Sequence, residues 1–481
     1  MMSRTERITE DYRLTSLTVP NTLSWTLGYN ADDDITGLTD NLVGSNSQTL
    51  GYDNLNRLNT GSGAYGSLSY GYDANGNRNT ETLNGTNTTF TIASSSNQLV
   101  SLSGGININY SYDAGGNLTG DGTNTYTYDN TNRLASVVTS SGTDTYQYNA
   151  LGQRVEKTVG STTTVYVYDE AGHLIGEYTP SGTLIAEHIW LNDRPIGVKT
   201  STGLYYVHTD QLNTPRYITN SSKTVVWQWS SDPFGNTTPT GSLTYNLRFP
   251  GQYYDAETGY NYNYFRDYDP TTGRYIESDP IGLAGGSPST YAYAGGNPFS
   301  NFDPLGLFCT SSGGYTLCAY PGGPAFMLPT PQGFPAYFGP SNFILYHKYE
   351  VSVPIGCDTP SEALEGLINH PTPGNPQPAT VSGTPNNAPA LIFPNNPVTS
   401  YLTTDLVTGA PLVVNITGAG SAFGPGYVAR EVSNGAVNTY GEGLNPLQSP
   451  AFVGYLIRYF AEHHVWGTQT KSFLSECGCS H

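Results

Sequence analysis

A short tyrosine motif that recurs about every 20 residues constrains the fold of this chain more than any other feature. The unit reads Tyr-x-Tyr-Asp-x-x-Gly/Asn, and its second tyrosine stands at positions 29, 52, 72, 112, 128, 148 and 168. The gap of 40 residues in this series hides a degenerate copy, Phe90-Thr91-Ile92 followed by Asn97-Gln98-Leu99. A fixed period of this length is typical of proteins that stack one small structural unit.

Each unit predicts a β-hairpin. Aromatic and small polar residues alternate before the Asp-x-x-Gly turn, and a second run such as Leu134-Ala135-Ser136-Val137-Val138 follows the turn. A single hairpin is marginally stable in water, so stacked units must bury each other's tyrosine rings. One tyrosine per unit on a fixed face favours a core or lining role over the alternative, a surface on which sugars stack. We therefore expect a mainly β protein, a hairpin solenoid or shell.

The repeats lead into a block of a different kind, residues 250–307. Two near-identical pentapeptides lie 24 residues apart in it, Asp279-Pro280-Ile281-Gly282-Leu283 and Asp303-Pro304-Leu305-Gly306-Leu307. The second pentapeptide ends where the composition of the chain changes. Around them, in this order, stand Gly259-Tyr260, Tyr264-Phe265-Arg266, Tyr268-Asp269-Pro270, Gly273-Arg274-Tyr275, Tyr291-Ala292-Tyr293 and Asn297-Pro298.

These segments resemble the core domain of bacterial Rhs and YD-repeat proteins, and with the repeats the resemblance covers about residues 29–307. It implies a self-cleaving aspartic protease that cuts after the last Leu and leaves a variable C-terminal toxin inside a hollow β-shell. Here the cut would fall between Leu307 and Phe308, and Arg266 matches an arginine of the family motif. The repeat array is short for a complete shell of this family, so we expect the terminal portion of a larger protein.

The residues also carry a chemical argument, with Asp279 and Asp303 as the catalytic candidates. Two carboxylates held close share a proton, so one can activate water as a general base while the other donates a hydrogen bond to the scissile carbonyl. The following prolines fix both turns, Gly306 permits close backbone approach, and Arg266 would orient a carboxylate or the cut end. Phe308 has no nucleophile, which argues against an intein-like N→O shift. The simpler alternative is that Asp-Pro-x-Gly is turn chemistry alone.

The net charge of −19 argues against a nucleic-acid or anionic-membrane surface on the shell. Only 12% of the residues are charged, whereas Gly and Tyr number 56 and 38, as suits β repeats with tight turns. Residues 1–14 mix both charge signs and lack an apolar run, so we expect no conventional signal peptide. No stretch predicts a membrane span. The resemblance implies a bacterial protein, and its export would therefore require a dedicated secretion or injection machinery as a partner.

The segment after Leu307 predicts a small α+β domain without repeats. Residues 452–460 carry the strongest helical spacing of apolar residues in the chain. The other expected elements are a helix that starts at the capping box Thr359-Pro360-Ser361-Glu362 and runs to about His370, strands at Leu412–Ile416 and at Tyr427–Val432, and coil at 320–338 and 371–397.

The active-site candidates of this domain are Arg430 and Glu431, which end the glycine-rich stretch Gly418–Gly426 and would face an anion. Its five cysteines cannot pair fully. We assign no metal or cofactor to the Cys477-Gly478-Cys479 tail or to His208 and Asp210 in the repeats. Four Lys/Arg against nine Asp/Glu in residues 308–481 disfavour a nuclease that grips phosphates. The toxic chemistry itself is not encoded in any motif that we recognise.

We therefore expect three parts: a repeat shell over residues 1–245, a self-cleaving core over 246–307 and a C-terminal effector over 308–481. The effector would act on competing bacteria or on host cells, and a cognate immunity protein would be its second partner. Two alternatives remain open. One is a structural or adhesive YD-repeat protein whose Asp-Pro turns only plug the shell, and the other is a truncated, silent cassette.

Overall fold

The computed structural model divides the chain into two compact units, Met1–Phe308 and Cys309–His481. It describes residues 4–9, 13–169, 171–280, 282, 287–307, 310–312, 315–319, 325–329, 346–355, 359–372, 377–387, 397–404, 410–417, 426–433 and 436–444.

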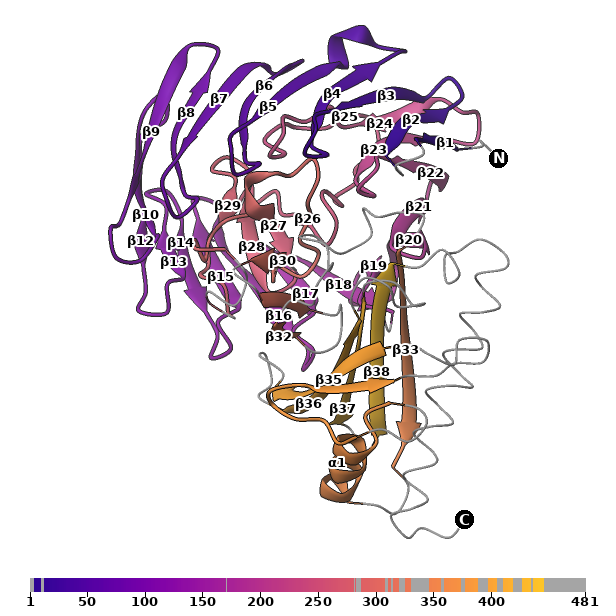
Figure 1. Cartoon of the computed structure of the whole chain (residues 1–481). Coiled ribbons are helices and arrows are strands. Elements are labelled where there is room, and N and C mark those ends of the chain that lie inside the picture. The colour runs from indigo at the N-terminus through magenta and orange to yellow at the C-terminus, as the bar shows by residue number, and fades with distance from the viewer. Residues whose placement is uncertain are drawn as a thin grey trace. The chain divides into compact units, whose positions relative to one another are not determined.

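The first unit is dominated by antiparallel strands, and within each sheet every strand pairs with the next strand in the sequence. β1 to β11 form one sheet and β12 to β25 form another. Figure 1 shows both sheets curving around the core strands β26 to β29. The bounds are β1 Thr5–Ile8, β2 Leu14–Val19, β3 Leu23–Tyr29, β4 Ile35–Asp40, β5 Gln48–Tyr52, β6 Leu58–Gly63, β7 Gly66–Tyr72, β8 Arg78–Leu83, β9 Thr86–Ile92, β10 Leu99–Gly104, β11 Ile108–Asn109, β12 Ser111–Tyr112, β13 Leu118–Gly120, β14 Thr125–Tyr128, β15 Leu134–Thr139, β16 Gly142–Tyr148, β17 Arg154–Val159, β18 Thr162–Tyr168, β19 Leu174–Tyr178, β20 Leu184–Leu191, β21 Arg194–Thr200, β22 Gly203–Thr209, β23 Pro215–Thr219, β24 Val225–Gln228 and β25 Thr240–Gly241.

The Asp-x-x-Gly/Asn part of the repeat forms the turn at one edge of the sheet. The Asp side chain accepts hydrogen bonds from the backbone N–H groups two and four residues later, as at Asp53, Asp129 and Asp210. The residue three places after the Asp has a positive φ, 58° at Asn56 and 85° at Gly76. Gly and Asn tolerate this region best, which explains their place in the motif.

In five of the units, the second tyrosine joins its strand to the preceding strand. Its hydroxyl donates to the backbone carbonyl of the first residue in the preceding strand, a contact that we call the tyrosine clasp. Trp190 makes the equivalent contact to the Leu174 carbonyl through Nε1. The clasps, 2.7–3.0 Å long, join Tyr29 to Leu14, Tyr52 to Ile35, Tyr72 to Leu58, Tyr148 to Leu134 and Tyr168 to Arg154.

The first tyrosine of the unit packs into the interior, as expected for a core or lining residue. Tyr126, Tyr146 and Tyr166 are at most 4% exposed. The Tyr126 ring stacks on Tyr260 of the core block with centroids 5.8 Å apart, and Tyr166 meets Tyr253 edge to face at 5.4 Å. The tyrosine wall of the shell and the core block therefore share one interior.

The core block contains a four-stranded antiparallel sheet that buried ion pairs attach to the shell. Arg154 donates to both carboxylate oxygens of Asp255 at 2.5 and 3.0 Å, and Lys157 Nζ lies 2.7 Å from the same carboxylate. Loss of one partner from a buried pair costs about 3–5 kcal/mol, so these contacts fix the core block within the shell. The core elements are β26 Tyr253–Tyr254, β27 Asn261–Asn263, β28 Arg266–Asp269, β29 Arg274–Tyr275 and the 3-10 turn η3 Ala294–Gly296.

Side chains join the beginning of the first sheet to β21 and β22 of the second sheet in the first unit. Arg4 precedes β1 and donates from Nη1 to the carbonyl of Thr209 in β22 at 2.5 Å. Arg194 Nη2 of β21 lies 3.5 Å from Glu6 Oε1 of β1. The strand series therefore closes on itself through polar contacts.

The second unit contains a six-stranded antiparallel sheet in the order β33-β38-β37-β36-β35-β34 and a helix, α1. Ala363 and Leu367 of α1 pack with Val413 and Val437 of the sheet. The bounds are β33 Tyr346–Pro354, α1 Pro360–Asn369, β34 Thr384–Asn387, β35 Pro397–Thr404, β36 Pro411–Thr417, β37 Gly426–Ser433 and β38 Ala436–Leu444, beside a three-stranded sheet of β30 Thr310–Ser312, β31 Tyr315–Ala319 and β32 Ala325–Pro329.

The mainly β fold is confirmed, and so are the predicted elements at α1, β36 and β37. Thr359 and Glu362 form the expected capping box. The coil expected at 320–338 and 371–397 is wrong in part, because β32 and β34 lie within these ranges. Each strand pairs with its neighbour in the sequence, β32 with β31 and β34 with β35, and this pairing overrides local Pro and Gly content. The helix expected at 452–460 lies outside the described residues.

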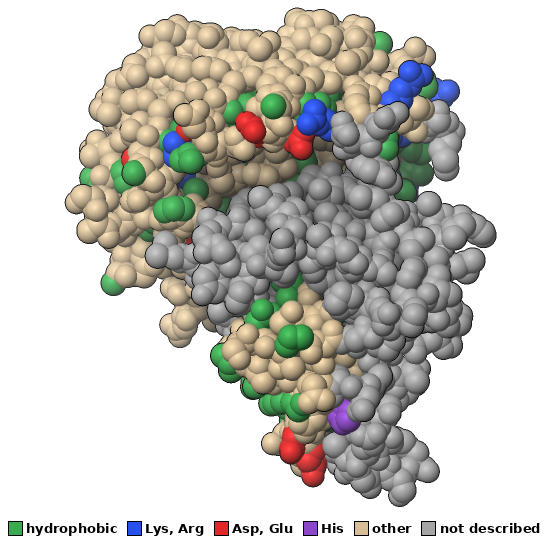
Figure 2. Space-filling view, in the orientation of Figure 1, with side chains coloured by type: hydrophobic (Ala, Val, Ile, Leu, Met, Phe, Trp, Pro, Cys, Tyr) green, Lys and Arg blue, Asp and Glu red, His purple; other side chains and the backbone are tan. Residues whose placement is uncertain are grey.

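Charged side chains are sparse over the described residues on the face that Figure 2 shows. Uncharged polar groups and backbone dominate that face, in line with the low share of charged residues. Among the helices of the described residues, none is long and apolar enough to cross a bilayer.

Candidate functional site

Two aspartates and one arginine that the sequence singled out converge in the core block. Arg266 Nη2 lies 3.1 Å from Asp279 Oδ2 and 3.2 Å from Asp303 Oδ2. Arg266 is the first residue of β28, Asp279 follows β29, and Asp303 follows η3. The three residues are 2%, 8% and 1% exposed, so their charges meet away from bulk water. Buried charges of this kind are stable only when they are paired.

Arg266 also holds the backbone on either side of the two carboxylates. Its Nε donates to the Gly306 carbonyl at 2.5 Å and its Nη1 donates to the Thr290 carbonyl at 3.0 Å. Burial lowers the pKa of Arg266, but the charges of Asp279 and Asp303 and the nearby Tyr275 outweigh it and raise the pKa above its usual value. The guanidinium therefore stays charged while it binds the segment that ends at Leu307.

Asp303 organises the turn that ends at Leu307. Its Oδ1 accepts a hydrogen bond from the Leu307 N–H at 2.7 Å, and Leu307 is 1% exposed. Gly306 has φ of 69°, and a Cβ there would lie 2.8 Å from the Asn263 carbonyl oxygen. The backbone approach expected at Gly306 is thus close enough to exclude a side chain. Phe308, on the other side of the expected cut, lies outside the described residues.

The arginine changes the electrostatics that the sequence suggested. We expected two neighbouring carboxylates to share a proton, as like charges do at close range. The structure adds a guanidinium about 3 Å from both, which places a fixed positive charge beside the two carboxylates. The arrangement therefore supplies carboxylates that can accept a proton, beside a fixed positive charge.

A second pair of buried carboxyl groups lies in the same core, on the other side of β28. The Asp267 N–H donates to Glu277 Oε2 at 2.8 Å, and the two residues are 4% and 2% exposed. Burial raises the pKa of Asp267 to about 7. Burial and the charge of Asp267 raise the pKa of Glu277 well above its usual range. Consecutive strand residues point to opposite faces, so Asp267 points away from the Arg266 side.

Sequence reasoning missed two residues of the site, Asn263 and Tyr275. Tyr275 Oη donates to Asp303 Oδ2 at 2.7 Å, and Asn263 Nδ2 donates to the Asp303 carbonyl at 2.7 Å. Asn263 pairs directly with Arg266 across the two-residue turn between β27 and β28. The hairpin at Asn263-Tyr264-Phe265-Arg266 was the available signal, because residues opposite each other in a hairpin share a face.

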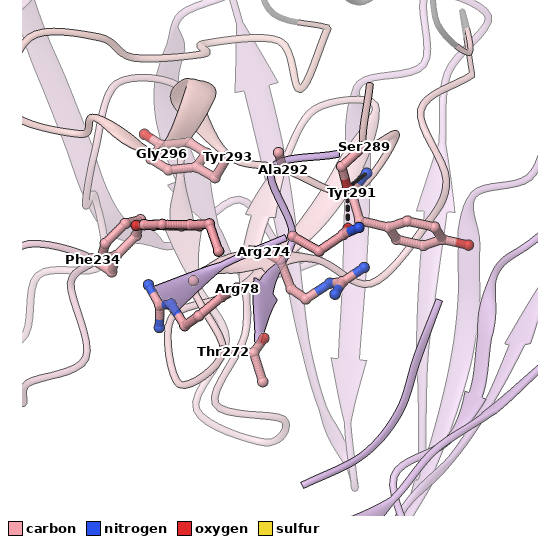
Figure 3. Close-up of a pocket in the computed structure, with 13 residues that line it drawn as sticks. Arg78, Phe234, Thr272, Arg274, Ser289, Tyr291, Ala292, Tyr293 and Gly296 are labelled. Atoms are coloured by element: carbon pink, nitrogen blue, oxygen red, sulfur yellow. Dashed lines mark hydrogen bonds between the residues drawn. The ribbon is translucent and has the colours of Figure 1, made fainter. Parts of the chain in front are cut away.

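A pocket opens next to the site but outside the dyad, between the shell and the core block. Figure 3 shows Arg78 beside Phe234 on one side of this pocket and Arg274 toward Tyr291 on the other. The Arg78 and Arg274 guanidinium carbons lie 4.3 and 4.9 Å from those ring centroids. Ser289 of the core donates to Asn77 Oδ1 of the shell at 2.5 Å. The pocket therefore belongs to the seam between shell and core.

In the second unit, Arg430 and Glu431 do not converge on one site. They are consecutive in β37, so their side chains point to opposite faces of the sheet. Arg430 is fully buried opposite Val413, on the face that packs against α1. Glu431 accepts a hydrogen bond from Tyr440 Oη at 3.3 Å. Most of the glycine-rich stretch that was expected to accompany them, residues 418–425, lies outside the described residues.

His208 and Asp210 have structural partners in the shell. His208 Nε2 lies 2.9 Å from Thr219 Oγ1, and Asp210 caps its own turn through Leu212 and Thr214. Burial, with a smaller effect from Arg4, lowers the pKa of His208 to about 4. The cysteine tail at residues 477–479 lies outside the described residues.

Comparison with known proteins supplies the context of this site. Residues 3–283 match the family model described as the Teneurin YD-shell. The double-stranded DNA deaminase toxin A of Burkholderia cenocepacia is 33% identical over 210 residues, covering 41% of this chain and 14% of that protein. The toxin protein Tse5 of Pseudomonas aeruginosa is 41% identical over 103 residues, covering 21% of this chain and 8% of that protein. The chain thus spans a small part of either relative.

A solved structure shares the fold. The Tc holotoxin pore of Photorhabdus luminescens superposes with a TM-score of 0.53 at 16% identity, over 68% of this chain and 19% of that chain. At this identity the likeness concerns the fold alone. The family model and the sequence relatives confirm the resemblance to Rhs and YD-repeat proteins.

Proposed function

Because the chain belongs to the Teneurin YD-shell family, we propose that its core cuts the chain after Leu307 and separates the C-terminal segment from the shell. The observation that carries the proposal is the meeting of Asp279 and Asp303 on Arg266. Arg266 also donates a hydrogen bond to the Gly306 carbonyl, and Asp303 accepts one from the Leu307 N–H. The site therefore binds the backbone just before the proposed cut.

In the proposed reaction, water attacks the carbonyl carbon of Leu307. A carboxylate takes one proton from the water as general base while the new C–O bond forms. The C–N bond to Phe308 then breaks, and the proton passes to the departing nitrogen. The products are a carboxylate at Leu307 and an amine at Phe308, so the reaction consumes only water. Fixed positive charge from Arg266, in a site shielded from solvent, favours the charged intermediate.

We propose further that residues 308–481 are an effector that acts after release. Relatives named as toxins and the shell fold support this role. The effector would reach competing bacteria or host cells through a dedicated secretion machinery, and the producing cell would need an immunity protein. The segment has four Lys/Arg against nine Asp/Glu, and this acidic balance argues against a nucleic-acid target bound through its phosphates.

A structural role for the Asp-Pro turns is the second candidate. It is favoured by the complete hydrogen bonding of Asp303, whose carboxylate accepts from Leu307, Tyr275 and Arg266, as a purely architectural turn would require. The protein would then be a structural or adhesive YD-repeat protein, or a silent cassette, and would stay in one piece.

Denaturing electrophoresis with mass spectrometry decides between the two. The purified wild-type chain should separate into residues 1–307 and 308–481, with a new N-terminus at Phe308. Asp279→Asn and Asp303→Asn should each leave the chain whole, because Asn can neither take up a proton nor pair with Arg266 as a carboxylate does. Asp232→Asn is the matched control, since Asp232-Pro233 is an Asp-Pro turn of the shell whose carboxylate accepts the Asn236 N–H. A whole wild-type chain, or an efficient cut in either dyad variant, would contradict the proposal.

A further inference from the structure

Tyr275 contacts both kinds of charge in the candidate site. Its hydroxyl donates to Asp303 Oδ2 at 2.7 Å, and the guanidinium carbon of Arg266 lies 3.6 Å from the centroid of its ring. The residue is 1% exposed. One side chain therefore fixes the carboxylate through its hydroxyl and the arginine through its ring.

Asn263 determines the direction of that hydroxyl. Its Nδ2 lies 3.2 Å from Tyr275 Oη and 2.7 Å from the Asp303 carbonyl oxygen. An amide NH2 group can only donate, so the Tyr275 oxygen accepts from Asn263. The phenolic proton is then left for Asp303 Oδ2.

We propose that Tyr275 is a positioning residue for self-cleavage, which holds the Asp303 carboxyl group in a fixed orientation as a hydrogen-bond acceptor. Asp303 Oδ2 accepts from both Tyr275 and Arg266, and Oδ1 accepts from the Leu307 N–H. Because these three donors already bind its carboxylate, Asp303 serves to orient the chain before the cut. The task of taking a proton from water then falls to Asp279, the second carboxylate on Arg266. This inference rests on the proposed function and assigns different roles to the two aspartates.

A buried tyrosine with only a structural role would also be bonded, so the test requires a matched control. Tyr268 is 0% exposed, and its ring centroid lies 6.0 Å from that of Tyr275. Its hydroxyl donates to the Phe234 carbonyl at 2.7 Å, the same length as the bond from Tyr275 to Asp303. Tyr268→Phe therefore removes an equivalent buried bond that does not involve the dyad.

The experiment follows the cut during folding of the full chain. Wild type, Tyr275→Phe, Tyr268→Phe and Asp303→Asn are isolated in urea and diluted into buffers from pH 5 to pH 9, and the fragments are quantified over time. Tyr275→Phe should slow the cut about 10–100-fold, as expected for loss of a hydrogen bond to a charged group. The acid limb of its pH–rate profile should move to higher pH, because a carboxylate with one donor fewer takes up a proton more readily. Tyr268→Phe should keep the wild-type profile.

An unchanged rate and profile in Tyr275→Phe, with Asp303→Asn uncut, would overturn the positioning role and leave the proposed function standing. An equal shift in Tyr268→Phe would also overturn it. If Tyr275→Phe does not fold, 3-fluorotyrosine at position 275 provides the second measurement. It keeps the ring and is a stronger donor, so the acid limb should move to lower pH, and no movement would overturn the inference. A wild-type chain that stays whole would overturn the proposed function itself.

Discussion

Replacing Asp267 with Asn should stabilise the first unit, by an amount that grows with pH. Burial raises the pKa of Asp267 from 3.8 to about 7. Between these values the unfolded chain releases a proton that the folded protein retains, so wild-type stability falls as pH rises. A gap of about 3 pH units, at about 1.4 kcal/mol each, gives about 4 kcal/mol above pH 7 and nearly nothing at pH 4. Asp267→Asn removes this cost because Asn does not ionise.

The assay is thermal unfolding at pH 4.5 and at pH 8, at one scan rate. The Asp279→Asn background keeps every sample a single chain if the proposed cut occurs. At about 2 °C per kcal/mol for a unit of this size, Asp267→Asn should raise Tm by roughly 8 °C at pH 8 and by much less at pH 4.5. Equal shifts at the two pH values, or a lower Tm than wild type at pH 8, would refute the electrostatic account of this pair.

Asp255 provides a contrast of opposite sign in the same core. Burial would raise the pKa of Asp255, but the charges of Arg154 and Lys157 outweigh it and lower the pKa below its usual value. Asp255 therefore contributes stability above its unfolded pKa, and this contribution is lost as pH falls. Asp255→Asn should lower Tm at pH 8 and do so less at low pH, the reverse of Asp267→Asn.

The remaining predictions concern the cut and the released segment. Gly306→Ala should slow or abolish the cut, because the added Cβ would lie 2.8 Å from the Asn263 carbonyl oxygen. Gly282→Ala is the control and should cut normally, because Gly282 also has a positive φ but has no atom within 4 Å of an added Cβ. The yield of the two fragments measures both effects. Residues 308–481 expressed alone, in the cytoplasm or exported to the periplasm, should slow bacterial growth without fragmenting DNA, and normal growth in both compartments with folded protein present would contradict an antibacterial effector. Glu431→Gln should reduce that harm without changing the fold, as circular dichroism would check, if Glu431 takes part in the effector chemistry.

The sequence predicts the shell well because its repeat acts locally. The Asp53 side chain accepts hydrogen bonds from backbone N–H groups only two and four residues away. Asn56 adopts the positive φ that its position in the motif implies. Turn and strand are thus encoded within one unit of the sequence. The same holds for α1, whose capping box lies within four residues.

The candidate site was predictable only where a motif marks a residue. Asp279, Asp303 and Arg266 were found in this way. Tyr275 and Asn263 were missed because their roles depend on contacts with Asp303, 28 and 40 residues away. The contact of one guanidinium nitrogen with both carboxylates was not predictable either, since no local pattern in the sequence specifies it. Contacts between residues that lie far apart in the chain produce no repeating pattern that a single sequence could reveal.

The tyrosine clasp determines how many residues a sheet of such repeats can gain or lose at a time during evolution. A clasp joins the residue before one turn to the residue after the previous turn, as from Tyr52 to Ile35. Loss or gain of a whole unit leaves every remaining hydroxyl opposite an equivalent carbonyl. A change of another length leaves a hydroxyl and a carbonyl unmatched, and an odd change turns the inward tyrosines outward. Size variation among such walls should therefore proceed in whole hairpins, with recombination points inside the Asp-x-x-Gly turns.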